Sequence, residues 1–160
     1  MLARIFLAAA LLISTPVLAE PPPAGFQFYC LRNNCKPSGA ASIPYSDKLM
    51  VDMSRVTTSV NRSIRYRTEG RERWQANVSS GDCEDFALTK RHRLIRMGYP
   101  ASALRMAVGH TSKGEYHAVL VVVTSNGRYA LDNLTDQVLP IGKSKVRIRK
   151  MASANPMVWG

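Results

Sequence analysis

A single cysteine stands among carboxylates in the stretch Gly-Asp-Cys-Glu-Asp-Phe at residues 81–86. From Asp82 onward the chain contains neither Gly nor Pro until Gly98, which predicts a helix between these two residues. Cys83 would lie in its first turn, where free backbone N–H groups lower the pKa of a thiol and can bind an oxyanion. Cys83 is therefore a candidate nucleophile, although the adjacent carboxylates oppose its ionisation. The alternative is a buried structural cysteine.

A thiol nucleophile needs a base, and the base needs an acceptor that orients it. Residues 116–123 are rich in β-branched side chains and predict a central strand that carries His117 near its start. Residues 128–134 predict the return strand of a hairpin, and this strand carries Asp132. In an antiparallel hairpin, the residue numbers of each facing pair add to the same sum. That sum is odd in every register we considered, and the numbers of His117 and Asp132 also add to an odd sum. Both side chains are therefore expected on one face of the sheet.

The length of the hairpin turn decides how close His117 and Asp132 lie. A two-residue turn at Asn126 and Gly127 would offset them by four residues, or roughly 13 Å. A four-residue loop over residues 124–127 would offset them by two, near the roughly 7–8 Å diagonal that a side chain can bridge. A catalytic pair thus predicts the longer loop or a bulge. The alternatives are a structural or solvated histidine and an aspartate that merely ends a strand.

Two other histidines fit the role of the base less well. His92 follows Cys83 by nine residues on the same predicted helix, which separates them by roughly 13 Å along the axis. His110 lies in a predicted turn over residues 110–115 and has no obvious acceptor nearby.

The remaining elements predict an α+β domain. A helix is expected from Ser46 or Asp47 to about Tyr66, followed by a polar loop with Trp74 as its one large anchor. After the Cys83 helix come strands at about 104–108, at 138–141, and at the basic C-terminal segment around 143–149. The face of the Cys83 helix that we expect in water carries four basic residues, Lys90, Arg91, Arg93 and Arg96.

The N-terminus and the cysteine count point to export. Residues 1–19 contain Arg4, a short apolar run and small residues, which is typical of a secretory signal peptide cut after Ala19. The apolar run is too short for an ordinary membrane-spanning helix, and no later stretch is longer, although an uncleaved anchor is the alternative. In an oxidising compartment Cys30 and Cys35 are close enough to pair, which leaves Cys83 as an odd thiol. The spacing of cysteines and histidines disfavours zinc.

The formal charge of +11 admits several partners. Export argues against nucleic acid, so an anionic envelope surface or an acidic protein fits better, with a merely solvated basic surface as the alternative.

Three sequence blocks together resemble the bacterial transglutaminase-like cysteine proteinases. The blocks are Gly81-Asp-Cys-Glu-Asp-Phe86, Gly114-Glu-Tyr-His117 and Leu131-Asp-Asn-Leu134, and the likeness extends from about Ser46 to Pro140. The resemblance implies a papain/transglutaminase-like core, with the catalytic cysteine at a helix N-terminus packed on an antiparallel sheet. It also implies that Cys83 is the nucleophile, His117 the base and Asp132 the residue that orients it.

The best-known members of this family are periplasmic, calcium-dependent proteases that release a large surface adhesin. By this resemblance Asp82 and Glu84 would bind calcium, which would neutralise carboxylates that oppose the thiolate. Their alternative role is to cap the helix without a metal. This chain is shorter than the adhesin-releasing proteases, and its pair of N-terminal cysteines is not required for the chemistry, so its substrate can differ.

The sequence therefore predicts a signal peptide over residues 1–19, an irregular segment with a Cys30–Cys35 loop over 20–45, and a protease domain over 46–160. The predicted activity is that of an exported cysteine peptidase, periplasmic or secreted, which cleaves an envelope or surface protein. Its chemistry requires no cofactor, and calcium is the candidate ion. Transglutaminase-type acyl transfer and a catalytically silent envelope binding module are the rival functions.

Overall fold

The computed structural model of the chain describes residues 19–68 and 73–160. The predicted signal peptide lies outside the described residues except for Ala19. Within those two ranges, no helix combines the length and the apolar character needed to cross a membrane.

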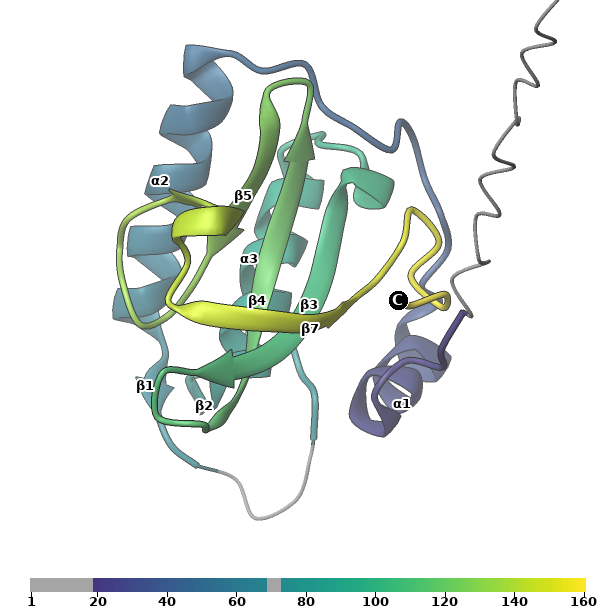
Figure 1. Ribbon diagram of the computed structural model, residues 1–160, viewed down its shortest axis with the longest axis vertical. Coiled ribbons are helices and arrows are strands. Elements are labelled where there is room, and N and C mark those ends of the chain that lie inside the picture. Colours follow the sequence, from purple (N-terminus) through teal and green to yellow (C-terminus); the bar gives the residue numbers. More distant parts are fainter. Residues whose placement is uncertain (1–18, 69–72) are drawn as a thin grey trace, which may run out of the picture.

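The centre of the fold is a five-stranded antiparallel sheet in the order β6-β5-β4-β3-β7 (Figure 1). Its strands are β3 (Leu104–Thr111), β4 (Tyr116–Thr124), β5 (Gly127–Leu131), β6 (Leu139–Pro140) and β7 (Val146–Met151). The middle strand, β4, is buried along most of its length because its β-branched residues are covered on both faces. Two short 3₁₀ helices, η1 (Ala101–Ala103) and η2 (Ile141–Lys143), connect the elements.

Two helices cover one side of this sheet, which confirms the predicted α+β class. Helix α2 (Asp47–Ser63) begins at the predicted cap, where the Ser46 hydroxyl accepts a hydrogen bond from the Leu49 N–H at 3.2 Å. Helix α3 (Cys83–Arg96) packs against strand β4 and against the neighbouring helix α2 (Figure 1). A short parallel ladder of β1 (Arg65–Tyr66) and β2 (Ser80–Gly81) leads the chain directly into α3.

The N-terminal segment differs from the prediction, because residues 20–45 are not irregular throughout. Helix α1 (Ala24–Asn33) forms there and buries Phe26 against the rings of Trp74 and Trp159, with each pair of ring centroids 5.5 Å apart. Cys30 belongs to this helix, and its predicted disulfide with Cys35 is present just after the helix ends. Packing against aromatic residues that are distant in sequence stabilises this short helix, which the local sequence pattern did not predict.

The prediction for the wet face of α3 was partly wrong. Lys90 is 0% exposed and Arg91 is 9% exposed, although both were expected in water. Helix α3 has the sheet on one side and α2 on another, so burial extends around most of its circumference over its first nine residues. The Arg91 guanidinium compensates by donating to the Leu104 carbonyl at 2.9 Å and to the Ala101 carbonyl at 3.4 Å.

Candidate active site

The β4–β5 hairpin brings His117 and Asp132 together. Leu120 pairs with Leu131, and the ladder continues to Thr124 and Gly127, so the turn consists of residues 125 and 126. The predicted turn at Asn126 and Gly127 is therefore displaced by one residue, and Gly127 adopts a φ of 111° that favours glycine. The resulting register has the offset of two residues that a catalytic pair requires. A tight two-residue turn provides this offset, so the predicted longer loop or bulge is wrong.

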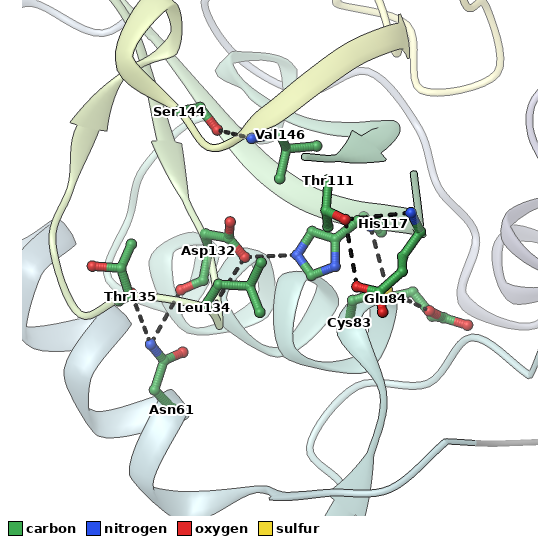
Figure 2. Close-up of polar contacts among 12 residues, drawn as sticks. Asn61, Cys83, Glu84, Thr111, His117, Asp132, Leu134, Thr135, Ser144 and Val146 are labelled. Carbon is green, nitrogen blue, oxygen red and sulfur yellow. Dashed lines mark hydrogen bonds and ion pairs between the residues drawn. The ribbon is translucent and has the colours of Figure 1, made fainter. Parts of the chain in front are cut away.

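Asp132 follows directly after β5, and its carboxylate reaches the buried imidazole of His117. His117 Nε2 lies 2.7 Å from Asp132 Oδ1, and both side chains are at most 7% exposed (Figure 2). Because Nε2 faces the carboxylate, Nδ1 is the ring nitrogen left for a second partner. In Figure 2 the imidazole lies between the Asp132 carboxylate and Cys83.

Hydrogen bonds from two other segments hold Asp132 in place. The Leu134 N–H donates to Asp132 Oδ1 at 3.1 Å. The Asn61 amide, from α2, donates to the carbonyls of Asp132 and Thr135 and to the Asp136 carboxylate at 2.9–3.1 Å (Figure 2). Burial raises the pKa of Asp132, but its hydrogen bond to His117, the His117 charge and the Leu134 N–H outweigh this and lower the pKa below its ordinary value. Asp132 is thus held as a carboxylate.

Cys83 is a free thiol at the first residue of α3, as predicted, and its side chain is buried. Its Sγ accepts a hydrogen bond at 3.3 Å from the N–H of Ala118, the residue of β4 that follows His117. The thiol itself donates to Glu84 Oε2 at 3.2 Å. Burial raises the pKa of Cys83, and the Glu84 charge raises it further, while the Ala118 N–H lowers it. The thiol therefore needs help to ionise.

Asp82 and Glu84 form a carboxylate pair beside this thiol. Burial and a hydrogen bond to Asp82 raise the pKa of Glu84 to about 8. Asp82 is the N-cap residue of α3, yet its side chain makes no capping hydrogen bond, and its Oδ1 is buried without a partner among residues 19–68 and 73–160. A carboxylate oxygen in that state is costly unless a cation is nearby. The two carboxylates thus fit a cation better than they fit helix capping.

Those two carboxylates do not form a complete metal site by themselves. In the described part of the chain, no group of three or more His, Cys, Asp or Glu side chains could hold a metal ion. Calcium accepts six to eight oxygen ligands, including backbone carbonyls and water, so the pair could supply only part of its coordination.

The start of α3 also explains two further residues of the stretch 81–86, Asp85 and Gly81. The Asp85 Oδ1 accepts a hydrogen bond from the Gln75 N–H at 2.7 Å, which fixes the preceding loop to the helix. A Cβ on Gly81 would lie 2.0 Å from Asp85 Oδ2, so only glycine fits there. His110, now within β3, packs its ring against Tyr116 instead of approaching Cys83.

Sequence reasoning missed two contributors to this site. The Ala118 N–H could not be foreseen, because backbone groups carry no sequence signal. Lys90 was assigned to water by helical periodicity, but it is fully buried, and burial lowers its pKa to about 7 although the Asp132 and Asp136 carboxylates oppose that fall.

Comparisons with known proteins agree with this fold. A search of curated proteins gave no match. Among solved structures, the calcium-bound form of LapG from Legionella pneumophila matches with a TM-score of 0.60 and 22% identity, over 66% of this chain and 66% of that chain. The EGTA-treated form matches with a TM-score of 0.57 and 23% identity, over 64% and 62% of the two chains. At these identities the likeness concerns the fold, and it spans slightly less than two thirds of the LapG chain.

The family comparison covers more of the chain than the structural matches do. The profile of the bacterial transglutaminase-like cysteine proteinases matches residues 18–160, well beyond the predicted range of Ser46 to Pro140. This protein therefore belongs to the bacterial transglutaminase-like cysteine proteinase family.

Proposed function

We propose that this protein is an exported cysteine peptidase that cleaves a peptide bond in an envelope or surface protein with Cys83, His117 and Asp132. One observation carries the proposal. The buried imidazole of His117 lies 2.7 Å from the buried carboxylate of Asp132, and the next residue in the chain, Ala118, donates its N–H to the free thiol of Cys83. Nucleophile, base and orienting acceptor are thereby supplied by α3, β4 and the end of β5.

In this mechanism His117 Nδ1 takes the proton from Cys83 Sγ, and Asp132 stabilises the imidazolium that forms. The thiolate, supported by the Ala118 N–H, attacks the carbonyl carbon of the scissile peptide bond. Backbone N–H groups at the start of α3 stabilise the oxyanion. His117 then gives its proton to the leaving amine, which leaves a thioester. Water, deprotonated by His117, attacks the thioester and regenerates the thiol.

We also propose that Asp82 and Glu84 contribute ligands to a calcium ion. Support comes from the buried, unpartnered oxygen of Asp82 and from the raised pKa of Glu84, which both describe carboxylates that lack a counter-charge. One LapG structure is described as calcium-bound. When bound, calcium would supply positive charge that removes the opposition of these carboxylates to the thiolate. The proton transfer itself uses only Cys83, His117 and Asp132.

The proposal of export and of a surface-protein substrate rests on the sequence. Residues 1–19 predict a signal peptide, and the Cys30–Cys35 disulfide suits an oxidising compartment. The charge of +11 favours an acidic protein or an anionic surface as the partner. A surface adhesin is one such substrate, since this is what the best-known family members cleave.

A peptide-based electrophile tests whether Cys83 is a nucleophile. The wild type should be labelled at Cys83 and nowhere else. Labelling should disappear in Cys83→Ser, fall strongly in His117→Ala, and fall less in Asp132→Asn, since Asp132 does not enter the bond changes. His92→Ala is the matched control, because His92 lies on α3 away from Cys83, and it should keep the wild-type rate. Equal labelling of the wild type and His117→Ala would refute the proposed base.

Two rival functions give different results in companion assays. Transglutaminase-type acyl transfer would attach an amine probe to protein substrates through the same thioester. A silent binding module would show no electrophile labelling and no change in envelope protein fragments between cells with wild-type protein and cells with Cys83→Ser. The peptidase predicts new fragments in the wild-type cells only, and their termini identify the cleaved bond.

A further inference from the structure

A groove of about 550 Å³ lies between the N-terminal segment and strands β3 and β7. Pro21–Pro23 line it on one side, and Arg149 and Lys150 of β7 line it on another. Val108 and Gly109, which are buried in β3, complete this part of its lining. The proposed bond changes use none of these residues, so the groove needs an explanation of its own.

The groove begins one strand away from the proposed nucleophile. Val108 faces Ala118 across the β3–β4 ladder, and the Ala118 N–H donates to Cys83 Sγ. The side chains of these three residues belong to one hydrophobic cluster. His110 and Tyr116 face each other two positions further along the same ladder, and they line the groove with ring centroids 6.1 Å apart. Since strands lie about 4.8 Å apart and an extended peptide rises about 3.3 Å per residue, a residue about two to four positions from the scissile bond reaches the groove.

A β-bulge brings two consecutive basic residues to the groove. In the β3–β7 ladder the register shifts between Val108 and Gly109, and Arg149 is the extra residue of β7. Regular alternation would put Arg149 and Lys150 on opposite faces of the sheet, yet both line the groove. A Cβ on Gly109 would lie 2.1 Å from the Arg147 carbonyl oxygen, so glycine is required where the two strands approach. The bulge thus directs positive charge into the groove.

Hydrogen bonds and an ion pair hold the proline wall of the groove in place. Glu20 and Trp159 exchange backbone hydrogen bonds of 2.7 and 3.2 Å, and the Glu20 carboxylate pairs with Lys150. At the other end of the wall, the Gln27 side chain donates to the Pro22 carbonyl at 2.8 Å. Proline also fixes its own φ, so the wall has little freedom to collapse. The groove is therefore preformed.

The charges around the groove favour an acidic occupant. Glu20 neutralises Lys150, but Arg149 is exposed and forms no ion pair within residues 19–68 and 73–160. In the same part of the chain, no acidic side chain lines the groove. A guanidinium can bind a carboxylate through two parallel hydrogen bonds.

We propose that this groove is a substrate subsite, in which Arg149 binds an acidic side chain about two to four residues from the scissile bond. The proline wall and the rings of His110 and Tyr116 pack against apolar neighbours of that acidic residue. This inference rests on the proposed peptidase function of Cys83, and it adds a substrate class to that function.

The test is the cleavage pattern of a synthetic random-sequence peptide mixture in calcium and low salt, read by mass spectrometry of the new termini. The mixture reports residues on both sides of each cut and does not require the natural substrate. Arg149→Glu reverses the charge in the groove. Arg147→Glu is the matched control, because Arg147 is an exposed arginine of the same strand that does not line the groove. Cys83→Ser gives the background.

The wild type should enrich Asp and Glu about threefold at one position, the size expected of an exposed ion pair, and about 1 M salt should weaken this preference. Arg149→Glu should reverse the preference to Lys and Arg at that position, and Arg149→Gln should remove it without reversal. Arg147→Glu should keep the wild-type pattern. A merely solvated basic strand predicts equal effects of the two Glu variants or no preference at any position, and either result would overturn the inference.

The subsite and the proposed function fail in different ways. If the wild type cuts no peptide above the Cys83→Ser background, the peptidase function fails, and the subsite fails with it. If the wild type cuts peptides but its preference does not depend on Arg149, only the subsite fails.

Discussion

Glu84 should restrain the nucleophile in the metal-free protein, and replacing it should release the thiolate. The Glu84 carboxylate lies 3.2 Å from Cys83 Sγ, and both side chains are buried. A charge this close and this poorly solvated shifts a neighbouring pKa by about one to three units. Glu84→Gln keeps the shape and a polar group but removes the charge. We therefore expect the pKa of Cys83 to fall by about one to three units in chelator.

The pH dependence of this effect follows from the pKa of Glu84 itself. With a pKa of about 8, Glu84 gains its charge as the pH rises through 8, which is when a thiol must ionise. The difference between wild type and Glu84→Gln should therefore be small at pH 6 to 7 and should widen above pH 8. Since one pKa unit is about 1.4 kcal/mol, the variant should gain about tenfold or more in thiolate at a fixed alkaline pH.

The assay is the iodoacetamide alkylation rate of Cys83 from about pH 5 to 10, in excess chelator. Asp47→Asn is the matched control, because Asp47 is an exposed carboxylate in the first turn of α2 and lies far along the chain from the thiol. Its profile should coincide with that of the wild type. An inflection in Glu84→Gln that equals the wild-type inflection, or lies above it, would refute the electrostatic account of this site.

Three further predictions concern stability. Calcium at one hundred times its dissociation constant should add about 2.7 kcal/mol to the free energy of unfolding and raise Tm by about 5 to 10 °C. Asp82→Asn combined with Glu84→Gln should abolish this rise. A wild-type Tm that neither calcium nor chelator changes would remove the ion from the mechanism. In chelator, the raised pKa of Glu84 means that the folded state binds more protons than the unfolded state between about pH 4.5 and 8, so the contribution of Glu84 to stability should fall as the pH rises through that window. Glu84→Gln should flatten the dependence of Tm on pH, and parallel Tm curves for wild type and variant would contradict this. Cys30→Ser should lower the free energy of unfolding in urea by about 2 kcal/mol by opening the short loop to Cys35, while the alkylation rate of Cys83 stays at the wild-type value; a loss of reactivity would link the disulfide to the site.

The sequence by itself determined those features that depend on local pattern. Residues 81–86 combine a helix start, a thiol and acidic neighbours, and the absence of Gly and Pro up to Gly98 sets the extent of α3. Strand alternation has a period of two, so the parity of the residue numbers is enough to put His117 and Asp132 on one face of the sheet. The Ser46 cap of α2 and the α+β order follow from the same kind of local rule.

Tertiary structure decided the features that depend on contacts between distant segments. The hairpin could close at either of two turns, and only the packed sheet selected the register that brings His117 within 2.7 Å of Asp132. Helix α1 forms because Phe26 meets Trp74 and Trp159, which are far away in the chain. Helical periodicity placed Lys90 in water, since it identifies one apolar stripe and cannot tell that α2 and the sheet enclose most of α3. Burial is a property of neighbouring elements, and that is why the burial of Lys90 emerged only from the folded chain.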